Sequence, residues 1–174
     1  MSWLENILPG SKPPEVVNVI VETPKGSQNK YQYDKKNNII KLDRVLYSPF
    51  HYPGDYGFIP QTLCGDGDPL DGLVLVTEPT HPGILIECRP IGVMKMIDNG
   101  EEDDKILCVP ADDPRFSGFK DLKDVAEHVL KEIAHFFSVY KQLQGKKVEV
   151  KGWLGVKEAH KVILDSIKMY KSKK

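Results

Sequence analysis

The sequence has few cysteines and no long apolar run. Its 174 residues include three cysteines, Cys64, Cys88 and Cys108, and none of them stands in a CxxC spacing. Three cysteines without paired spacing predict neither a zinc site nor a disulfide framework, which is typical of a reducing cytoplasm. No stretch approaches the roughly 18 apolar residues of a membrane-spanning helix, and no basic segment followed by an apolar one opens the chain. We therefore expect a soluble, cytoplasmic protein.

An excess of charge of either sign is also missing. Lysine and arginine number 24 and the acidic residues 25, so the formal net charge is −1 at pH 7. This balance predicts no general attraction to nucleic acid or to an anionic membrane. The chain is 40% hydrophobic, which predicts one globular domain over residues 1–174 with a core of ordinary size.

The hydrophobic period changes from strand-like to helix-like about two-thirds along the chain. Strands are predicted at Val16–Glu22, Lys30–Asp34, Ile39–Asp43, Gly72–Glu78, Ile84–Ile97, Lys105–Val109 and Lys147–Trp153. Apolar residues at helical spacing predict helices over Asp121–Leu143 and Ala159–Tyr170. Strands first and helices last indicate an α+β fold, most simply a small barrel with helices outside it.

Two local signals shape the longest predicted strand. Pro90 and Gly92 predict a bend or bulge within it, and Asn99-Gly100 predicts a tight hairpin at its end.

The most informative segment is the acidic turn Asp66-Gly67-Asp68-Pro69-Leu70-Asp71-Gly72. Like charges about 4 Å apart repel by roughly 1 kcal/mol in water and by about 4 kcal/mol at an effective dielectric constant of 20. A hard divalent cation with oxygen ligands, such as Mg²⁺ or Ca²⁺, would offset that repulsion. A solvated acidic turn is the alternative. An EF-hand fits poorly, because Thr77 stands where its loop requires a glutamate.

A second acidic cluster occupies the predicted hairpin tip, residues 98–104. Taken alone, this cluster is typical of a solvated β-turn. Both clusters lie at strand ends, however. If these ends meet at one barrel mouth, Asp66, Asp71, Asp98 and Asp103 could hold more than one Mg²⁺.

Cationic and phenolic side chains stand near the same strand ends or on the long helix. They are Lys30, Arg44, Tyr52, Tyr56, Lys105, Tyr140 and Lys141. Each alone is compatible with an ordinary surface position. Together with carboxylates for Mg²⁺, they are typical of a polyphosphate site, since metals and an arginine fork both bind phosphate oxygens.

The acidic turn closely resembles the signature of the soluble (family I) inorganic pyrophosphatases, especially the short bacterial and archaeal type. The similarity continues in order through VIVETP, NKYQYD, LDRVLYSPFHYPGDYGFIP, RPIGVMKMID, IAHFFSVYKQL and VEVKGW, from about residue 14 to 170. It implies an OB-like barrel of five antiparallel strands with two main helices towards the C-terminus. It also implies a cytoplasmic homohexamer that uses several Mg²⁺ ions to hydrolyse inorganic diphosphate to two orthophosphates.

The resemblance also implies roles for individual residues. Asp66, Asp71 and Asp103 would hold the first metal, and Asp71 would bridge to a second. Asp98 and Asp103 would hold a metal that arrives with the substrate, and Glu22 a further one. Asp68 would be the general base that activates a metal-bridged water for direct attack, with the phenol of Tyr52 nearby. Phosphate would be bound by Lys30, Arg44, Tyr56, Lys105, Tyr140 and Lys141.

Two positions depart from the family pattern: Gln32 stands where relatives usually have glutamate, and Asn99 where some do. His51 and His135 are expected to be structural or interfacial.

Two alternatives stay open, an OB-fold nucleic-acid-binding module and a catalytically silent metal-binding relative. Acidic clusters at the mouth disfavour the first, and the second would require a missing core residue.

Self-association is suggested by the long predicted helix. Ala134, Phe136, Phe137 and Val139 add apolar surface beyond a single stripe, more than one core face requires.

Overall fold

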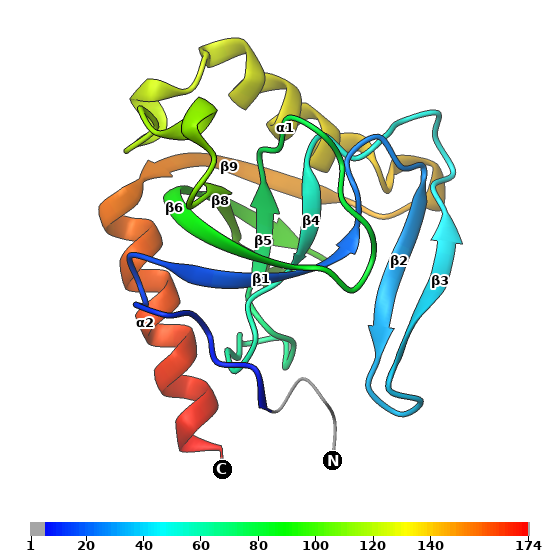
Figure 1. The fold of residues 1–174 in the computed structure, drawn as a ribbon. Helices are drawn as coiled ribbons and strands as arrows, with labels where there is room; N and C mark the ends of the chain where they lie inside the picture. Colours follow the sequence, from blue (N-terminus) through cyan, green and yellow to red (C-terminus); the bar gives the residue numbers. More distant parts are fainter. Residues whose placement is uncertain (1–5, 174) are drawn as a thin grey trace.

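The computed structural model describes residues 6–173 (Figure 1). Its strands are β1 (Val17–Thr23), β2 (Asn29–Asp34), β3 (Ile39–Val45), β4 (Asp55–Phe58), β5 (Asp71–Val74), β6 (Leu85–Asp98), β7 (Glu101–Glu102), β8 (Lys105–Pro110) and β9 (Val148–Gly155). Its α-helices are α1 (Glu127–Val139) and α2 (Val156–Ser172), and its short 3₁₀ turns are η2 (Pro114–Phe116), η3 (Leu122–Asp124) and η4 (Gln142–Gln144).

The main sheet closes into a ring. Strand β1 pairs with both β4 and β6, and the circuit continues from β4 through β5 and β8 back to β6. The α+β class with two helices near the C-terminus is therefore confirmed. One detail differs, because β5 and β8 are parallel while the other pairs in the ring are antiparallel. Strand β6 lies between β5 and β8 in the sequence and runs antiparallel to β8. The chain therefore reverses direction again after β6, and β8 points the same way as β5.

The long strand β6 bends as its sequence predicts. Its first part pairs with β1 and its second part with β9, and the register of β8 against it shifts between Pro90 and Gly92. Proline has no N–H for the ladder, so a bulge is the natural place for it. Asn99 and Gly100 have φ values of 51° and 86°, as a two-residue hairpin between β6 and β7 requires.

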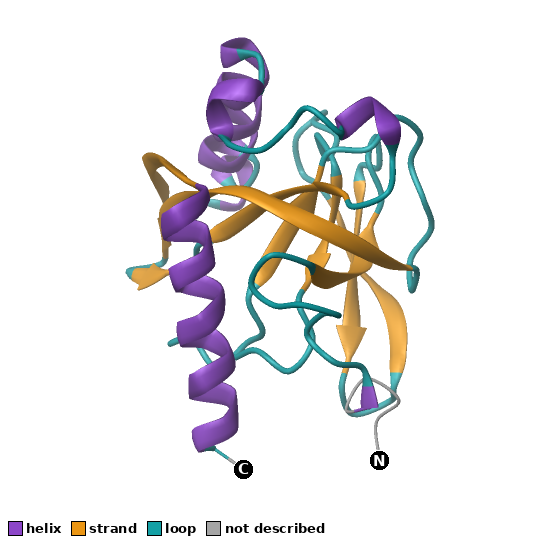
Figure 2. Cartoon of the chain, turned by 60° about the vertical axis from the view of Figure 1, so that its left-hand side comes forward, coloured by secondary structure: helices purple, strands orange, loops and turns teal. Residues whose placement is uncertain are grey.

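The helix predicted over residues 121–143 is interrupted, so its expected start is wrong. Asp121 and Asp124 form a capping box that closes only the single 3₁₀ turn η3, and the next residue, Val125, is extended with φ −95° and ψ 136°. The regular helix α1 begins two residues later. The second helix, α2, is confirmed and runs along one side of the ring (Figures 1 and 2). No helix within residues 6–173 is long and apolar enough to cross a membrane.

Two adjacent aromatic residues of α1 belong to the core of this chain. Phe136 and Phe137 are 4% and 1% exposed, and their rings lie 5.0 Å apart. Phe136 also packs on Tyr52 at 4.9 Å, and Phe137 on Tyr56 at 5.9 Å. The end of α1 is thus enclosed on more than one side. The expectation that these two phenylalanines lie on spare apolar surface was wrong.

Strands β2 and β3 form a separate two-stranded sheet that stands to one side of the ring (Figure 1). Its inner strand is fixed to β1 by side chains. Thr23 Oγ1 accepts from Tyr31 N at 2.9 Å, and Glu22 Oε1 accepts from Tyr33 N at 2.7 Å. The hairpin is therefore anchored at β2, while β3 leaves Ile39, Leu42 and Val45 about half exposed.

Candidate active site

The two acidic clusters meet at one cavity, as the sequence predicts. This cavity of about 450 Å³ is lined by Asp66, Asp68 and Asp71 from the loop before β5 and from its first residue. Asp98 at the end of β6 and Asp103 just before β8 complete the acidic lining. Both hairpin and loop are held by the closed ring, so the carboxylates are brought together by the topology.

The loop that carries Asp66 and Asp68 is ordered by its own hydrogen bonds. The Thr62 hydroxyl accepts from Leu70 N at 2.9 Å and donates to Ile59 O at 2.5 Å, which closes the base of the loop. At its tip, Asp66 Oδ1 accepts from Asp68 N at 2.9 Å, and Gly67 has a φ of 87°. A positive φ is readily adopted by glycine. The turn therefore presents Asp66 and Asp68 at the cavity without strain.

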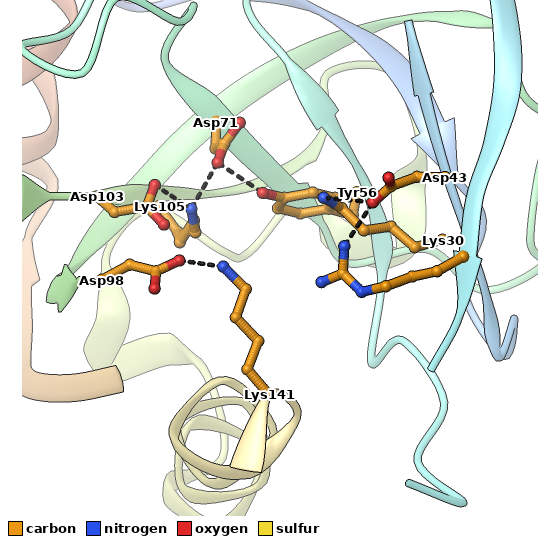
Figure 3. Close-up of polar contacts among 9 residues, drawn as sticks. Lys30, Asp43, Tyr56, Asp71, Asp98, Asp103, Lys105 and Lys141 are labelled. Atoms are coloured by element: carbon orange, nitrogen blue, oxygen red, sulfur yellow. Dashed lines mark hydrogen bonds and ion pairs between the residues drawn. The ribbon is translucent and has the colours of Figure 1, made fainter. Parts of the chain in front are cut away.

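Lys105 lies at the floor of the site, between two carboxylates (Figure 3). Its ammonium donates to Asp71 Oδ2 at 2.5 Å and to Asp103, and its side chain is only 2% exposed. Burial alone would lower the pKa of Lys105, but the charges of Asp71 and Asp103 raise it above its ordinary value. The Tyr56 hydroxyl donates to the same Asp71 oxygen at 2.5 Å. Burial raises the pKa of Asp71, against the charge of Lys105.

A second ammonium approaches the hairpin side of the cavity. Lys141, two residues beyond α1, forms an ion pair with Asp98 Oδ2 (Figure 3). The other oxygen, Asp98 Oδ1, is buried and has no partner among the described residues. Burial lowers the pKa of Lys141 and the charge of Lys30 adds to this, while the hydrogen bond to Asp98 opposes it. The unpaired oxygen of Asp98 can bind a cation, and the ammonium of Lys141 can bind an anionic ligand that arrives between the two side chains.

The donor set fits magnesium. Within residues 6–173, no three acidic, histidine or cysteine side chains converge as a ready metal site. The two ammonium groups lie among these carboxylates instead. The cavity offers five aspartates and Glu22, all of them hard oxygen donors, and one buried carboxylate oxygen is unpaired. Such donors suit Mg²⁺. Metal binding would compete with Lys105 and Lys141 for these carboxylates.

Lys30 on β2 also lines the cavity, and Asp43 links it to Arg44. Asp43 on β3 pairs with Lys30 at 3.4 Å and with Arg44 at 2.5 Å. Arg44 Nε and one of its terminal nitrogens are buried without partners in the described part of the chain. An unpartnered guanidinium edge of this kind can bind an oxyanion through two parallel hydrogen bonds.

Three of the predicted site residues do not line the cavity. Lys105 is buried against Asp71 and Asp103, and Arg44 pairs with Asp43, which is also outside the lining. Tyr52 is 2% exposed and packs on Tyr56 with ring centroids 5.3 Å apart. Burial raises the pKa of Tyr52 well above its ordinary value. The remaining predicted residues all line it, namely Glu22, Lys30, Tyr56, Asp66, Asp68, Asp71, Asp98, Asp103, Tyr140 and Lys141. Burial raises the pKa of Glu22 to about 7, although the hydrogen bond from Tyr33 opposes this.

Sequence reasoning missed two charged residues of the site. Asp43 bridges the two cations of the hairpin, and Lys35 forms an ion pair with Asp68 at 3.1 Å. The position of Asp43 beside Arg44 was a usable signal. No sequence signal marked Lys35, since it lies in a polar turn of ordinary composition.

Fold and site together define a class: an α+β protein with an acidic, oxygen-donor centre beside cationic side chains, which is the arrangement of phosphoryl-transfer enzymes that use metals. Comparison with known proteins identifies the family. Residues 19–171 match the profile of the family described as Inorganic pyrophosphatase. The chain belongs to this family.

Named relatives agree over nearly the whole length. An inorganic pyrophosphatase of Synechocystis is 51% identical over 164 residues, which cover 94% of this chain and 97% of that protein. One from Picrophilus torridus is 46% identical over 171 residues, covering 98% and 97%. The crystal structure of the Thermus thermophilus inorganic pyrophosphatase superimposes with a TM-score of 0.94 at 48% identity, covering 97% of this chain and 98% of that one.

Proposed function

We propose that this chain is an Mg²⁺-dependent diphosphatase that hydrolyses inorganic diphosphate to two orthophosphates. Its membership of the inorganic pyrophosphatase family supports the reaction. The observation that carries the proposal is a cavity lined by five aspartates together with Lys30 and Lys141. A diphosphate anion needs both kinds of group, because its oxygens bind the ammonium groups while the metal ions that accompany it bind the carboxylates.

The phosphate groups would be held by the cationic side chains and the phenols. Lys30, Tyr56, Tyr140 and Lys141 line the cavity. Arg44 lies outside the lining and has two guanidinium nitrogens without partners among the described residues. Lys105 would bind a phosphate oxygen from the floor when its carboxylate partners turn to another cation. As the bond to the leaving phosphate lengthens, these donors stabilise the growing negative charge, which needs no covalent intermediate.

Asp68 is the residue best situated to accept a proton. It is the most exposed of the ion-paired site carboxylates, with 63% side-chain exposure, and it lines the cavity. We assign it as the general base. The oxygen of an attacking water bonds to phosphorus, its proton moves to Asp68, and the electron pair of the broken P–O bond leaves with the second phosphate. The buried Tyr52 supports the neighbouring Tyr56 ring.

Magnesium would be held by Asp66, Asp71, Asp98, Asp103 and Glu22, and when bound it would neutralise phosphate oxygens and lower the pKa of water.

We further propose that the ring of strands is OB-like, that residues 1–174 form one catalytic domain, and that the enzyme is a cytoplasmic homohexamer. The OB-like barrel, the cytoplasmic location and the homohexamer rest on the family resemblance, and the single domain rests on the length and composition of the chain. No observation favours a nucleic-acid-binding module, since carboxylates occupy the mouth.

Orthophosphate release from diphosphate tests the proposal. The purified chain should release it with MgCl₂ and lose this activity with a chelator. The matched control is Asp68→Asn, which keeps the shape of the loop. Release at background level from the wild-type chain, across pH and MgCl₂ concentration, would contradict the proposed function. A silent metal-binding relative would then be the better description.

A further inference from the structure

The site is built from two separate sheets. The carboxylates belong to the main sheet and its loops, whereas Lys30, Asp43 and Arg44 belong to the separate β2–β3 sheet. Side chains of Glu22 and Thr23 fix β2 to β1 along the strand. Beyond them the hairpin continues to a turn, residues 35–38, that projects towards the acidic loop.

An ion pair joins this turn to the acidic loop. Lys35 Nζ donates to Asp68 Oδ1 at 3.1 Å, and both residues line the cavity. The turn itself is well fixed, because Asp34 accepts from Lys36 N at 2.9 Å and from Asn37 N at 3.2 Å. Lys35 is thus presented from an ordered turn. Its long side chain reaches Asp68 from this turn.

We propose that Lys35 is a positioning residue, which orients the Asp68 carboxylate and holds the hairpin tip over the acidic loop. The inference rests on the proposed function, since Asp68 is its assigned base. Of the hydrogen bonds found among the described residues, the bond from Lys35 is the one made to a side-chain oxygen of Asp68. Without it, the carboxylate can rotate freely in solvent, and fewer molecules hold it in the productive orientation.

The ion pair is exposed, with 62% and 63% of the two side chains accessible. Pairs of this kind are weak and are screened by salt. The contact can therefore open for diphosphate to enter and close again afterwards. The expected effect on turnover is correspondingly modest, about two- to five-fold.

The test compares Lys35→Ala with Lys36→Ala, its neighbour in the same turn, whose exposed side chain pairs with no carboxylate in the described contacts, and whose backbone bond to Asp34 the substitution keeps. We expect Lys35→Ala to lower kcat about two- to five-fold with little change in KM, and Lys36→Ala to leave both unchanged. Lys35→Arg should restore kcat. In high salt the ratio of kcat between wild type and Lys35→Ala should approach one, because the pair is screened.

Hydrogen exchange gives a readout independent of activity. Amides of residues 64–70 should exchange faster in Lys35→Ala than in wild type or Lys36→Ala, measured with and without MgCl₂. An unchanged exchange pattern together with an unchanged kcat would overturn the proposal. A rise in KM at constant kcat would also overturn it, since Lys35 would then bind the substrate instead. An inactive wild-type chain with faster exchange in Lys35→Ala would contradict the proposed function and leave the contact itself supported.

Discussion

Lys105 and Asp71 form a buried ion pair at the floor of the cavity, with 2.5 Å between the ammonium and Asp71 Oδ2. Asp103 binds the same ammonium, so one lysine neutralises two carboxylates. Asp71 and Lys105 stand opposite each other in the register of the parallel strands β5 and β8. The pairing of the two strands thus builds the charge balance of the site.

Lys105→Met should therefore destabilise the protein in the absence of metal. Removing one partner of a buried ion pair typically costs about 3–5 kcal/mol, because the remaining charge is left uncompensated. MgCl₂ should restore part of the loss, since a cation that binds the folded state stabilises it. Denaturant unfolding with and without MgCl₂ measures both effects.

Lys151→Met is the control, because Lys151 pairs with Glu149 in a site where both side chains are about half exposed. Its unfolding free energy should change by about 1 kcal/mol or less. Equal losses in the two variants, with no response to MgCl₂, would show that Lys105 is not a buried counter-charge.

Asp68→Asn and Asp71→Asn should affect activity in different ways. Asp68→Asn should lower turnover by about 10²–10⁴-fold, because asparagine keeps the shape but is not a usable base. Its Mg²⁺ requirement should change little. Asp71→Asn removes a charge bound to Lys105 and Tyr56, so the Mg²⁺ concentration for half-maximal rate should rise. Rate titrations against MgCl₂ separate the two, and near-normal turnover in Asp68→Asn would place the base elsewhere.

Some of this site was predictable because it is local in the sequence. The acidic turn, the Pro90–Gly92 bulge and the Asn99-Gly100 hairpin each depend on backbone preferences of a few residues, and each is observed. Side chains alternate along a strand, so Lys30 and Gln32 share one face of β2, and both line the cavity.

The predictions that failed concern features that tertiary packing decides. The burial of both Phe136 and Phe137 follows from the enclosure of the end of α1 by Tyr52 and Tyr56, which no period in the sequence encodes. The start of α1 was misplaced because the residues of η3 continue the helical stripe although their backbone does not. Leu122 packs closely against Gly92, where an added Cβ would lie 2.3 Å from its side chain.

Asp121→Ala should destabilise the fold away from the site. Asp121 Oδ1 accepts from Leu122 N at 2.8 Å and from Val156 N, the first residue of α2, at 3.1 Å. One carboxylate therefore caps both η3 and α2, and its loss should lower the unfolding free energy by about 1–2 kcal/mol. Asp113→Ala is the control, because Asp113 caps only the short turn η2. The loss should be larger for Asp121→Ala, with kcat of the folded enzyme unchanged.

Light scattering should give a mass of six chains at micromolar concentration, at neutral pH with MgCl₂. The exposed apolar residues of β3 supply surface that an assembly could bury, and closed symmetry is usual for homo-oligomers. His135 on α1 is exposed beside Phe50, with rings 6.0 Å apart, and it stays a predicted interface residue. A monomer mass under these conditions would contradict the hexamer.

Gln32 provides the most specific test of the cavity assignment. It lines the cavity with Lys30, and the family resemblance implies a glutamate at this position. Glutamine keeps the shape and a hydrogen-bonding oxygen but not the charge, so the weakest metal should bind less tightly than it would beside glutamate. Gln32→Glu should lower the Mg²⁺ concentration for half-maximal rate by a few-fold, which corresponds to a coupling of about 1 kcal/mol through partly solvated space. Lys36→Gln lowers the net charge by the same one unit in the nearby turn but outside the cavity lining, and it controls for general electrostatics. Superimposable Mg²⁺ titrations of wild type and Gln32→Glu at fixed diphosphate would mean that position 32 does not sense the metals.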